Sequence, residues 1–297
     1  EAVGLLPEHL TRYPHEFSGG QRQRISIARA IIRNPKVIIF DEATAMLDPQ
    51  GRKQMIEAAK RLQVEKGISI ILITHHMDEV ILADKVFVMK DGKVMGQGTP
   101  EQIFAKKELL EECGLCLPVF YQYLYFLIGQ GILSKEECDG IQNEKELSKL
   151  LCKKYNGIGR KTVSDGIYEG GRSDEKAPQK DTQTLKKEGI LLNHVSYIYN
   201  KGFSDERIAL NDVSLKIEKG EFVAVIGHTG SGKSTLMQHL NGLYLPTEGN
   251  VYFNGQDVTD KDFSLKKLRQ KVGLVFQYPE YQLFAETVEK DVCFGPE

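Results

Sequence analysis

An apolar segment runs directly into a glycine-rich loop in the last third of the chain. Phe222-Val223-Ala224-Val225-Ile226 precedes Gly227-His228-Thr229-Gly230-Ser231-Gly232-Lys233-Ser234-Thr235, and a helical pattern follows over residues 234–240. The stretch matches G-x-x-x-x-G-K-[ST], in which glycines let the backbone wrap closely around phosphate groups at a helix N-terminus. We therefore predict a strand, a phosphate-binding loop and a helix. The alternative, a glycine-rich turn without a ligand, does not explain both flanking elements.

The side chains of this loop suit a nucleotide with a bound cation. Lys233 is placed to reach β- and γ-phosphates, and the Ser234 hydroxyl is placed to ligate Mg²⁺. The loop residues that we predict to contact the nucleotide are Gly227, Gly230, Ser231, Gly232, Lys233, Ser234 and Thr235.

A second apolar segment ends in two carboxylates. Val37-Ile38-Ile39-Phe40 is followed by Asp41-Glu42. Carboxylates at the end of a buried strand lie at the edge of a sheet where ligands bind. We expect Asp41 to hold Mg²⁺ through water and Glu42 to orient or deprotonate an attacking water. Two solvated acids after a strand would be the structural alternative.

A third segment, Phe17-Ser18-Gly19-Gly20-Gln21-Arg22-Gln23-Arg24, precedes apolar residues at helical spacing. Ser18 is a favourable N-cap, so a helix N-terminus here would face anions. Taken alone, the segment fits a capped surface helix equally well.

The order of patterns predicts an α/β fold. Residues 69–73 form another short apolar run, and a helical pattern over residues 52–65 lies between the first two runs, as in strand–helix–strand units. Residues 85–95 predict a hairpin with an Asp91-Gly92 turn, and residues 251–255 predict a second one.

Composition limits the remaining possibilities. The net charge of −2 gives no strong attraction to nucleic acid or anionic membranes. We expect the apolar stretch over residues 117–133 to be a buried or amphipathic helix, because Pro118, glutamines and glycines interrupt it. Five cysteines without a signal peptide indicate reduced cytosolic thiols, and Cys113-x-x-Cys116 lacks the second pair of a zinc ribbon. Both ends of the sequence look cut.

Together these motifs resemble the ATP-binding-cassette (ABC) family, in a P-loop fold with a mixed β-sheet core, helices on both faces and an antiparallel β subdomain. Residues 227–235 match its Walker A motif and Asp41-Glu42 its Walker B motif. Further family motifs are matched by the signature Ser18-Gly19-Gly20-Gln21, the D-loop Asp48, the switch His75, the Q-loop Gln277 and the adenine-stacking Tyr199, with Tyr197 as its alternate. Ala43 and Phe17 depart from the usual Pro and Leu.

The resemblance implies roles for these residues. Glu42, His75 and Gln277 would be catalytic, and Ser234, Asp41 and Gln277 would bind Mg²⁺. ATP would also contact the signature residues and Asp48 of a second cassette.

Several segments, including residues 278–284 and the tail up to Tyr155, look like the ATPases of energy-coupling factor (ECF) transporters, which import vitamins and transition-metal ions. This implies a peripheral protein at the cytoplasmic face of the cell membrane. Its partners would be a second ABC ATPase, an integral membrane ECF component and a substrate-binding membrane protein. The alternatives are a soluble tandem-cassette ATPase without a membrane partner and an inactive truncated fragment.

The order of the motifs departs from the family. Residues 1–156 resemble the C-terminal half of a cassette, residues 157–187 a flexible linker, and residues 188–297 the N-terminal half of a cassette. We expect a piece of a tandem fusion, with circular permutation as the alternative. In the first case Glu42 and Lys233 serve different ATP molecules, and in the second they serve the same one.

Overall fold

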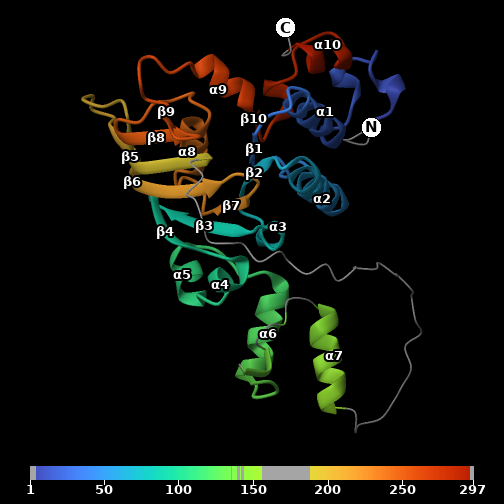
Figure 1. Cartoon of the computed structure of the whole chain (residues 1–297). Coiled ribbons are helices and arrows are strands. Elements are labelled where there is room, and N and C mark those ends of the chain that lie inside the picture. Colours follow the sequence, from blue (N-terminus) through green and yellow to red (C-terminus); the bar gives the residue numbers. More distant parts are fainter. Residues whose placement is uncertain (1–4, 135, 139–140, 142–143, 156–187, 295–297) are drawn as a thin grey trace. The chain divides into compact units, whose positions relative to one another are not determined.

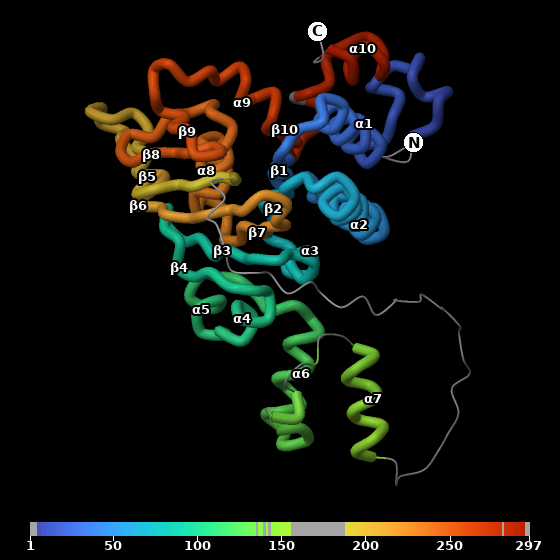
Figure 2. Tube along the Cα trace, viewed as in Figure 1, coloured from blue at the N-terminus to red at the C-terminus, as the bar shows by residue number. Residues whose placement is uncertain are grey.

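The computed structural model describes residues 5–134, 136–138, 141, 144–155 and 188–294. The chain divides into two compact units (Figures 1 and 2). The first comprises Glu1–Pro118 together with Lys187–Glu297, and the second is Val119–Lys186. The first unit therefore combines parts of both segments that the sequence separates.

A six-stranded sheet in the order β10-β1-β2-β7-β3-β4 forms the centre of the first unit (Figure 1). Neighbouring strands from β10 to β3 are parallel, and β4 is antiparallel to β3, so the sheet is mixed as predicted. The strands are β1 (Val37–Asp41), β2 (Ser69–Thr74), β3 (Lys85–Lys90), β4 (Lys93–Gly98), β7 (Phe222–Ile226) and β10 (Val272–Val275).

Strands from the two sequence segments are interleaved within this sheet. Strand β7 lies between β2 and β3, with Ile73 of β2 paired to Val225 of β7. On the other side of the sheet β10 pairs with β1, and Val275 lies opposite Phe40. The first and last parts of the chain thus build one sheet together.

Both faces of the sheet are covered, which explains the continuous apolar runs. Every residue of β1, β2 and β7 is buried. Ile39 and Val225 share a core cluster with Leu236 and Leu240 of α8 (Lys233–Leu240). On the opposite face Phe40 meets α1 (Gly19–Ile31) and α2 (Pro49–Lys66).

An antiparallel sheet in the order β6-β5-β8-β9 packs into the same core as α8. Its strands are β5 (Gly189–Tyr199), β6 (Arg207–Glu218), β8 (Glu248–Phe253) and β9 (Gln256–Asp257). Phe253 pairs with Gln256 across a turn at Asn254 and Gly255, which confirms the second predicted hairpin. The fold therefore has the antiparallel β subdomain that the resemblance implies.

Local signals set the ends of α1 and α2, which cover the same face of the sheet. The Ser18 hydroxyl accepts a hydrogen bond from the Gln21 N–H and so caps α1, as predicted. Helix α2 begins at Pro49, because Asp48 caps it and proline is tolerated in the first turn. It ends at Lys66, and Gly67 follows in a left-handed conformation. The apolar periodicity alone predicts a shorter helix there.

The remaining helices of the first unit are short. They are α3 (Met77–Val80), α4 (Pro100–Phe104), α5 (Lys107–Glu112), α9 (Leu265–Lys271), α10 (Val288–Cys293) and the 3-10 helices η1 (Pro7–His9), η2 (Pro14–Glu16) and η4 (Pro279–Tyr281).

The second unit contains α6 (Val119–Gly129), η3 (Glu136–Cys138) and α7 (Glu144–Tyr155). Leu124, Leu127, Leu133, Cys138 and Leu147 form its small core. Helix α6 confirms the helix expected within residues 117–133, and none of the helices in the described ranges is long and apolar enough to span a bilayer. The predicted linker, residues 157–187, lies outside the described residues, and all five cysteines are free thiols.

Candidate active site

The glycine-rich loop connects the buried strand β7 to helix α8. Gly230 and Gly232 have φ angles of +83° and +98°, which favour glycine. Lys233 is only 4% exposed, and its Nζ donates to the carbonyl oxygens of Gly227 (2.7 Å) and His228 (2.9 Å). The ammonium group is thus held over the loop at the C-terminal edge of the parallel sheet.

Asp41 and Glu42 lie at the same edge, at the end of β1. The Glu42 N–H donates to the carbonyl oxygen of Ile73 in β2 (2.9 Å). Glu42 has a φ angle of +47°, in the left-handed region that residues other than glycine seldom occupy. Such strained residues gather at functional sites, where the surrounding structure fixes their side chains.

Residues from both ends of the sequence meet at this edge. The Ser234 hydroxyl donates to Asp41 Oδ1 at 3.5 Å, and Lys233 Nζ lies 4.0 Å from Glu42 Oε1. On the other side of Glu42, His75 Nδ1 lies 3.6 Å from the same Oε1. Four of the predicted catalytic and metal-binding residues therefore form one cluster with Lys233.

Burial changes the acid–base properties of this cluster. Burial, together with the charge of Glu42, raises the pKa of Asp41 to about 6, although Lys233 and the Ser234 hydrogen bond oppose the shift. Burial also lowers the pKa of Lys233, while Glu42 and Asp41 act in the opposite direction. A ligand that carries phosphates and a divalent cation would stabilise the charged form of each group, because the cation would attract the Asp41 carboxylate and the phosphates would attract the Lys233 ammonium.

The oxygen donors of the cluster fit Mg²⁺. Asp41 and Ser234 provide a carboxylate and a hydroxyl, the hard ligands that Mg²⁺ prefers in a partly hydrated site. Gln277 follows β10 by two residues, and β10 is parallel to β1, so it lies at the same sheet edge. Within the described ranges no group of three or more His, Cys, Asp or Glu residues could hold a metal, and Cys113 with Cys116 is no exception.

Two tyrosines of β5 lie beside the helix that follows the loop. The Tyr199 hydroxyl is 3.2 Å from Thr235 Oγ1 and within hydrogen-bonding distance of Gln238 in α8. Tyr197 instead stacks on Tyr244, with ring centroids 5.3 Å apart. Both rings belong to an aromatic cluster with Tyr244, and Tyr199 is the one whose hydroxyl contacts a predicted nucleotide-binding residue, Thr235.

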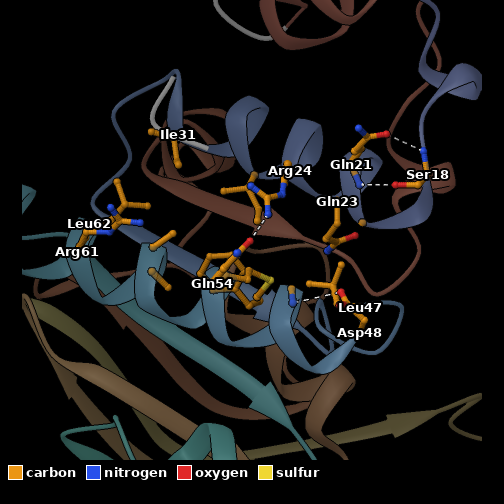
Figure 3. A pocket seen from close by; sticks show the side chains of 17 residues that line it. Ser18, Gln21, Gln23, Arg24, Ile31, Leu47, Asp48, Gln54, Arg61 and Leu62 are labelled. Carbon is orange, nitrogen blue, oxygen red and sulfur yellow. Dashed lines mark hydrogen bonds between the residues drawn. The ribbon is translucent and has the colours of Figure 1, made fainter. Parts of the chain in front are cut away.

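The signature and D-loop residues line a separate cavity of about 630 Å³ between α1 and α2 (Figure 3). Figure 3 shows Ser18, Gln21 and Asp48 at one end of this cavity. Gly20 also lines it, and a Cβ on Gly20 would be 3.0 Å from Leu47. Neither Lys233 nor Glu42 lines this cavity, so we do not assign it as the phosphate site. Within this one unit, the signature and the glycine-rich loop form two separate surfaces.

Several polar contacts between α1 and the segment after β10 have no signal in the sequence. Gln23 is fully buried, and its Nε2 donates to the Phe276 carbonyl oxygen at 3.1 Å. Arg22 Nη1 lies 2.7 Å from Glu280 Oε1. These contacts connect the signature helix to the region of Gln277, and they depend on the tertiary packing of α1 beside β10, which pairs with β1.

Comparisons with known proteins identify relatives of both segments. A sequence profile of the family described as ABC transporter matches residues 1–45 and 210–291. A protein of Caldanaerobacter subterraneus subsp. tengcongensis, provisionally named an ABC transporter ATP-binding protein, is 33% identical over 96% of this chain and 47% of its own length. The chain spans about half the length of such curated relatives.

A higher identity is confined to a shorter region. The energy-coupling factor transporter ATP-binding protein EcfA2 of the same organism is 60% identical over 107 residues, which is 36% of this chain and 37% of that protein. A solved structure described as a dimeric post-hydrolysis state of an ATP-binding cassette bound to ADP and Pi is 40% identical over 27% of this chain and 34% of that chain, with a TM-score of 0.25.

Proposed function

The chain belongs to the family of ABC transporter ATP-binding proteins, and on that premise we propose that it binds Mg-ATP and hydrolyses it. The observation that carries this proposal is the cluster of Lys233, Ser234, Asp41, Glu42 and His75 at one sheet edge. It combines a phosphate-binding loop, oxygen ligands for a cation and a carboxylate that could act as a base, as ATP hydrolysis requires.

Each group of the cluster has a distinct task in this proposal. The loop N–H groups and Lys233 bind the phosphates, and Ser234, Asp41 and Gln277 hold Mg²⁺. The cation, when bound, neutralises charge on the phosphate oxygens. Glu42 accepts a proton from the attacking water, while His75, 3.6 Å away, fixes the orientation of the Glu42 carboxylate.

We further propose that the two sequence segments act as one cassette within the chain. The alternation of β2, β7 and β3 supports this arrangement, in which Lys233 and Glu42 serve the same ATP molecule. The signature residues Ser18, Gly20 and Gln21 and the D-loop residue Asp48 line a cavity that neither Lys233 nor Glu42 reaches, in keeping with a role toward the ATP of a second ABC ATPase.

For the biological role we propose an ECF-type importer of vitamins or transition-metal ions. The 60% identity to EcfA2 over 107 residues supports it. Its partners would be an integral membrane ECF component and a substrate-binding membrane protein, with this chain peripheral at the cytoplasmic face. Tyr278 and Phe284 are exposed by 39% and 61% near Gln277, which fits a partner surface. Purification of the chain with membrane proteins of this class rather than with ribosomes would test the assignment.

Mg-ATP should stabilise the full chain against heat. A ligand at 100 times its Kd adds about 2.7 kcal/mol to the free energy of unfolding when only the folded state binds it. A melting curve with and without Mg-ATP measures this effect, with Mg-AMP as the control because AMP lacks the phosphates that Lys233 would contact. An unchanged melting temperature at millimolar Mg-ATP would contradict nucleotide binding.

The contribution of Mg²⁺ to ATP affinity should disappear in acid. Because the pKa of Asp41 is raised to about 6, the folded protein protonates this carboxyl as the pH falls through that value. Protonation removes a cation ligand, so the apparent Mg²⁺ affinity should fall about tenfold per pH unit below pH 6. The same raised pKa makes the unliganded fold less stable as the pH rises from about 4 to 6, because the folded state holds the extra proton.

Titration of Mg²⁺ against a fixed ATP concentration at several pH values tests this expectation. In Asp41→Asn the Mg²⁺ affinity should be low at every pH and should lack the step near pH 6. A step of equal size in that variant would assign the titration to another group.

A further inference from the structure

The turn between β3 and β4 packs directly against the phosphate-binding loop. The Gly92 N–H donates to the carbonyl oxygen of Ser231 at 3.1 Å, and the Gly92 carbonyl oxygen accepts from the N–H of Asn211 in β6 at 2.9 Å. Next to it, Asp91 Oδ1 lies 3.9 Å from His228 Nε2. The turn thus joins the loop to the antiparallel sheet, although it comes from the other sequence segment.

The packing at this contact leaves no space for a side chain. A Cβ on Gly92 would lie 2.7 Å from the carbonyl oxygen of Ala209, and the φ angle of Gly92 is +74°. A Cβ on Gly232 would lie 2.6 Å from the same oxygen and 3.3 Å from the Gly92 Cα. A Cβ on Gly227 would overlap the carbonyl oxygen of Met89 at the end of β3. Glycines are therefore required on both sides of the contact.

The hydrogen bond from Gly92 determines which way one loop peptide faces. The Ser231 carbonyl and the Gly232 N–H belong to one planar trans peptide, so they point in opposite directions. Because Gly92 holds the Ser231 carbonyl toward the β3–β4 turn, the Gly232 N–H is directed away from that turn. Backbone N–H groups of such loops bind phosphate when they are free to point toward it.

We infer that Gly92 is a positioning residue for the phosphate site, acting through its backbone N–H on the Ser231–Gly232 peptide. This inference rests on the proposed function of the loop. The sequence indicates only that Asp91-Gly92 closes a hairpin, because its contact with the loop depends on the insertion of β7 between β2 and β3. In the assembled unit the turn orients one donor of a site that lies about 140 residues further along the chain.

The test compares Gly92→Ala with Gly114→Ala in the full chain. Gly114 also has a left-handed backbone, with a φ angle of +67°, but a Cβ there meets nothing within 4 Å. Two readouts are needed: the Kd of fluorescent ADP, and amide hydrogen exchange of residues 227–232 without nucleotide. In Gly92→Ala we expect ADP affinity to fall on the order of 10-fold, as for the loss of one hydrogen bond to a charged group. Exchange in the loop should also be faster, while exchange in β8, which the turn does not contact, stays unchanged.

Each outcome decides between explanations. Gly114→Ala should match the wild type in both readouts. If Gly92→Ala does not fold, Gly92→Asn tolerates the left-handed backbone yet still carries a Cβ, and the same losses are expected. Wild-type exchange and wild-type ADP affinity in a folded Gly92 variant would overturn the inference. A different result would be that the wild-type chain binds no ADP while the loop of the Gly92 variant still exchanges faster than the wild-type loop. That result would contradict the proposed function and leave the role of the turn intact.

Discussion

Replacing Glu42 with Gln should reduce ATP turnover about 100-fold or more and leave ATP binding in place. General-base catalysis contributes about 10²- to 10⁴-fold to such reactions, and an amide cannot accept the proton. Glutamine has nearly the shape of glutamate, so the loop contacts of Lys233 to Gly227 and His228 should persist. Removing the charge also leaves the Lys233 ammonium without its neighbour at 4.0 Å, which should slightly strengthen its attraction to phosphate.

Phosphate release and the identity of the bound nucleotide together measure this effect. After incubation with Mg-ATP, the Glu42→Gln variant should retain ATP where the wild type retains ADP. Glu65→Gln is the matched control, because Glu65 is exposed near the end of α2, away from the sheet edge. Equal turnover in wild type and Glu42→Gln would show that another group, or none, accepts the proton.

Replacing Lys233 with Ala should weaken Mg-ATP binding about 10- to 100-fold. A hydrogen bond to a charged group is worth about 1.5–3 kcal/mol, and the Lys233 ammonium is nearly buried, where water screens it little. The substitution also removes the two hydrogen bonds to the carbonyl oxygens of Gly227 and His228, so the loop loses part of its fixed shape.

Isothermal titration with ATP and with adenosine separates these contributions. The loss in Lys233→Ala should be large for ATP and small for adenosine, because only the phosphates contact the ammonium. Lys266→Ala, an exposed position on α9, should bind both as the wild type does. If Lys233→Ala and the wild type bound ATP equally, the phosphates would have to lie elsewhere, for example in the cavity between α1 and α2.

The elements of this fold are readable from the sequence, but their arrangement is not. Continuous apolar runs identify β1, β2 and β7, since such runs are typical of strands buried on both faces. The N-cap at Ser18 and the Asp91-Gly92 turn likewise follow from local chemistry. These runs do not predict the order of the strands in the sheet, because Ile, Val and Leu pair equally well with any similar neighbour.

For the same reason the sequence leaves two arrangements of the active site open. Motif resemblance predicts Glu42 and Lys233 as a pair of functional residues, but whether they meet in one chain depends on the position of β7. The contacts of Ser234 with Asp41, of Lys233 with Glu42 and of Gly92 with Ser231 all depend on that position. They could not be predicted before the sheet order was known.

The central position of β7 also has a consequence for synthesis on the ribosome. Strands β2 and β3 are complete once Lys90 has been made, but the strand that separates them begins only at Phe222, 132 residues later. At about 5–20 residues per second, the nascent chain would wait roughly 7–26 s with both apolar edges unpaired. During that interval the unpaired strand edges are open to wrong strand pairing, so the yield of folded protein should depend on the rate of translation between these two points.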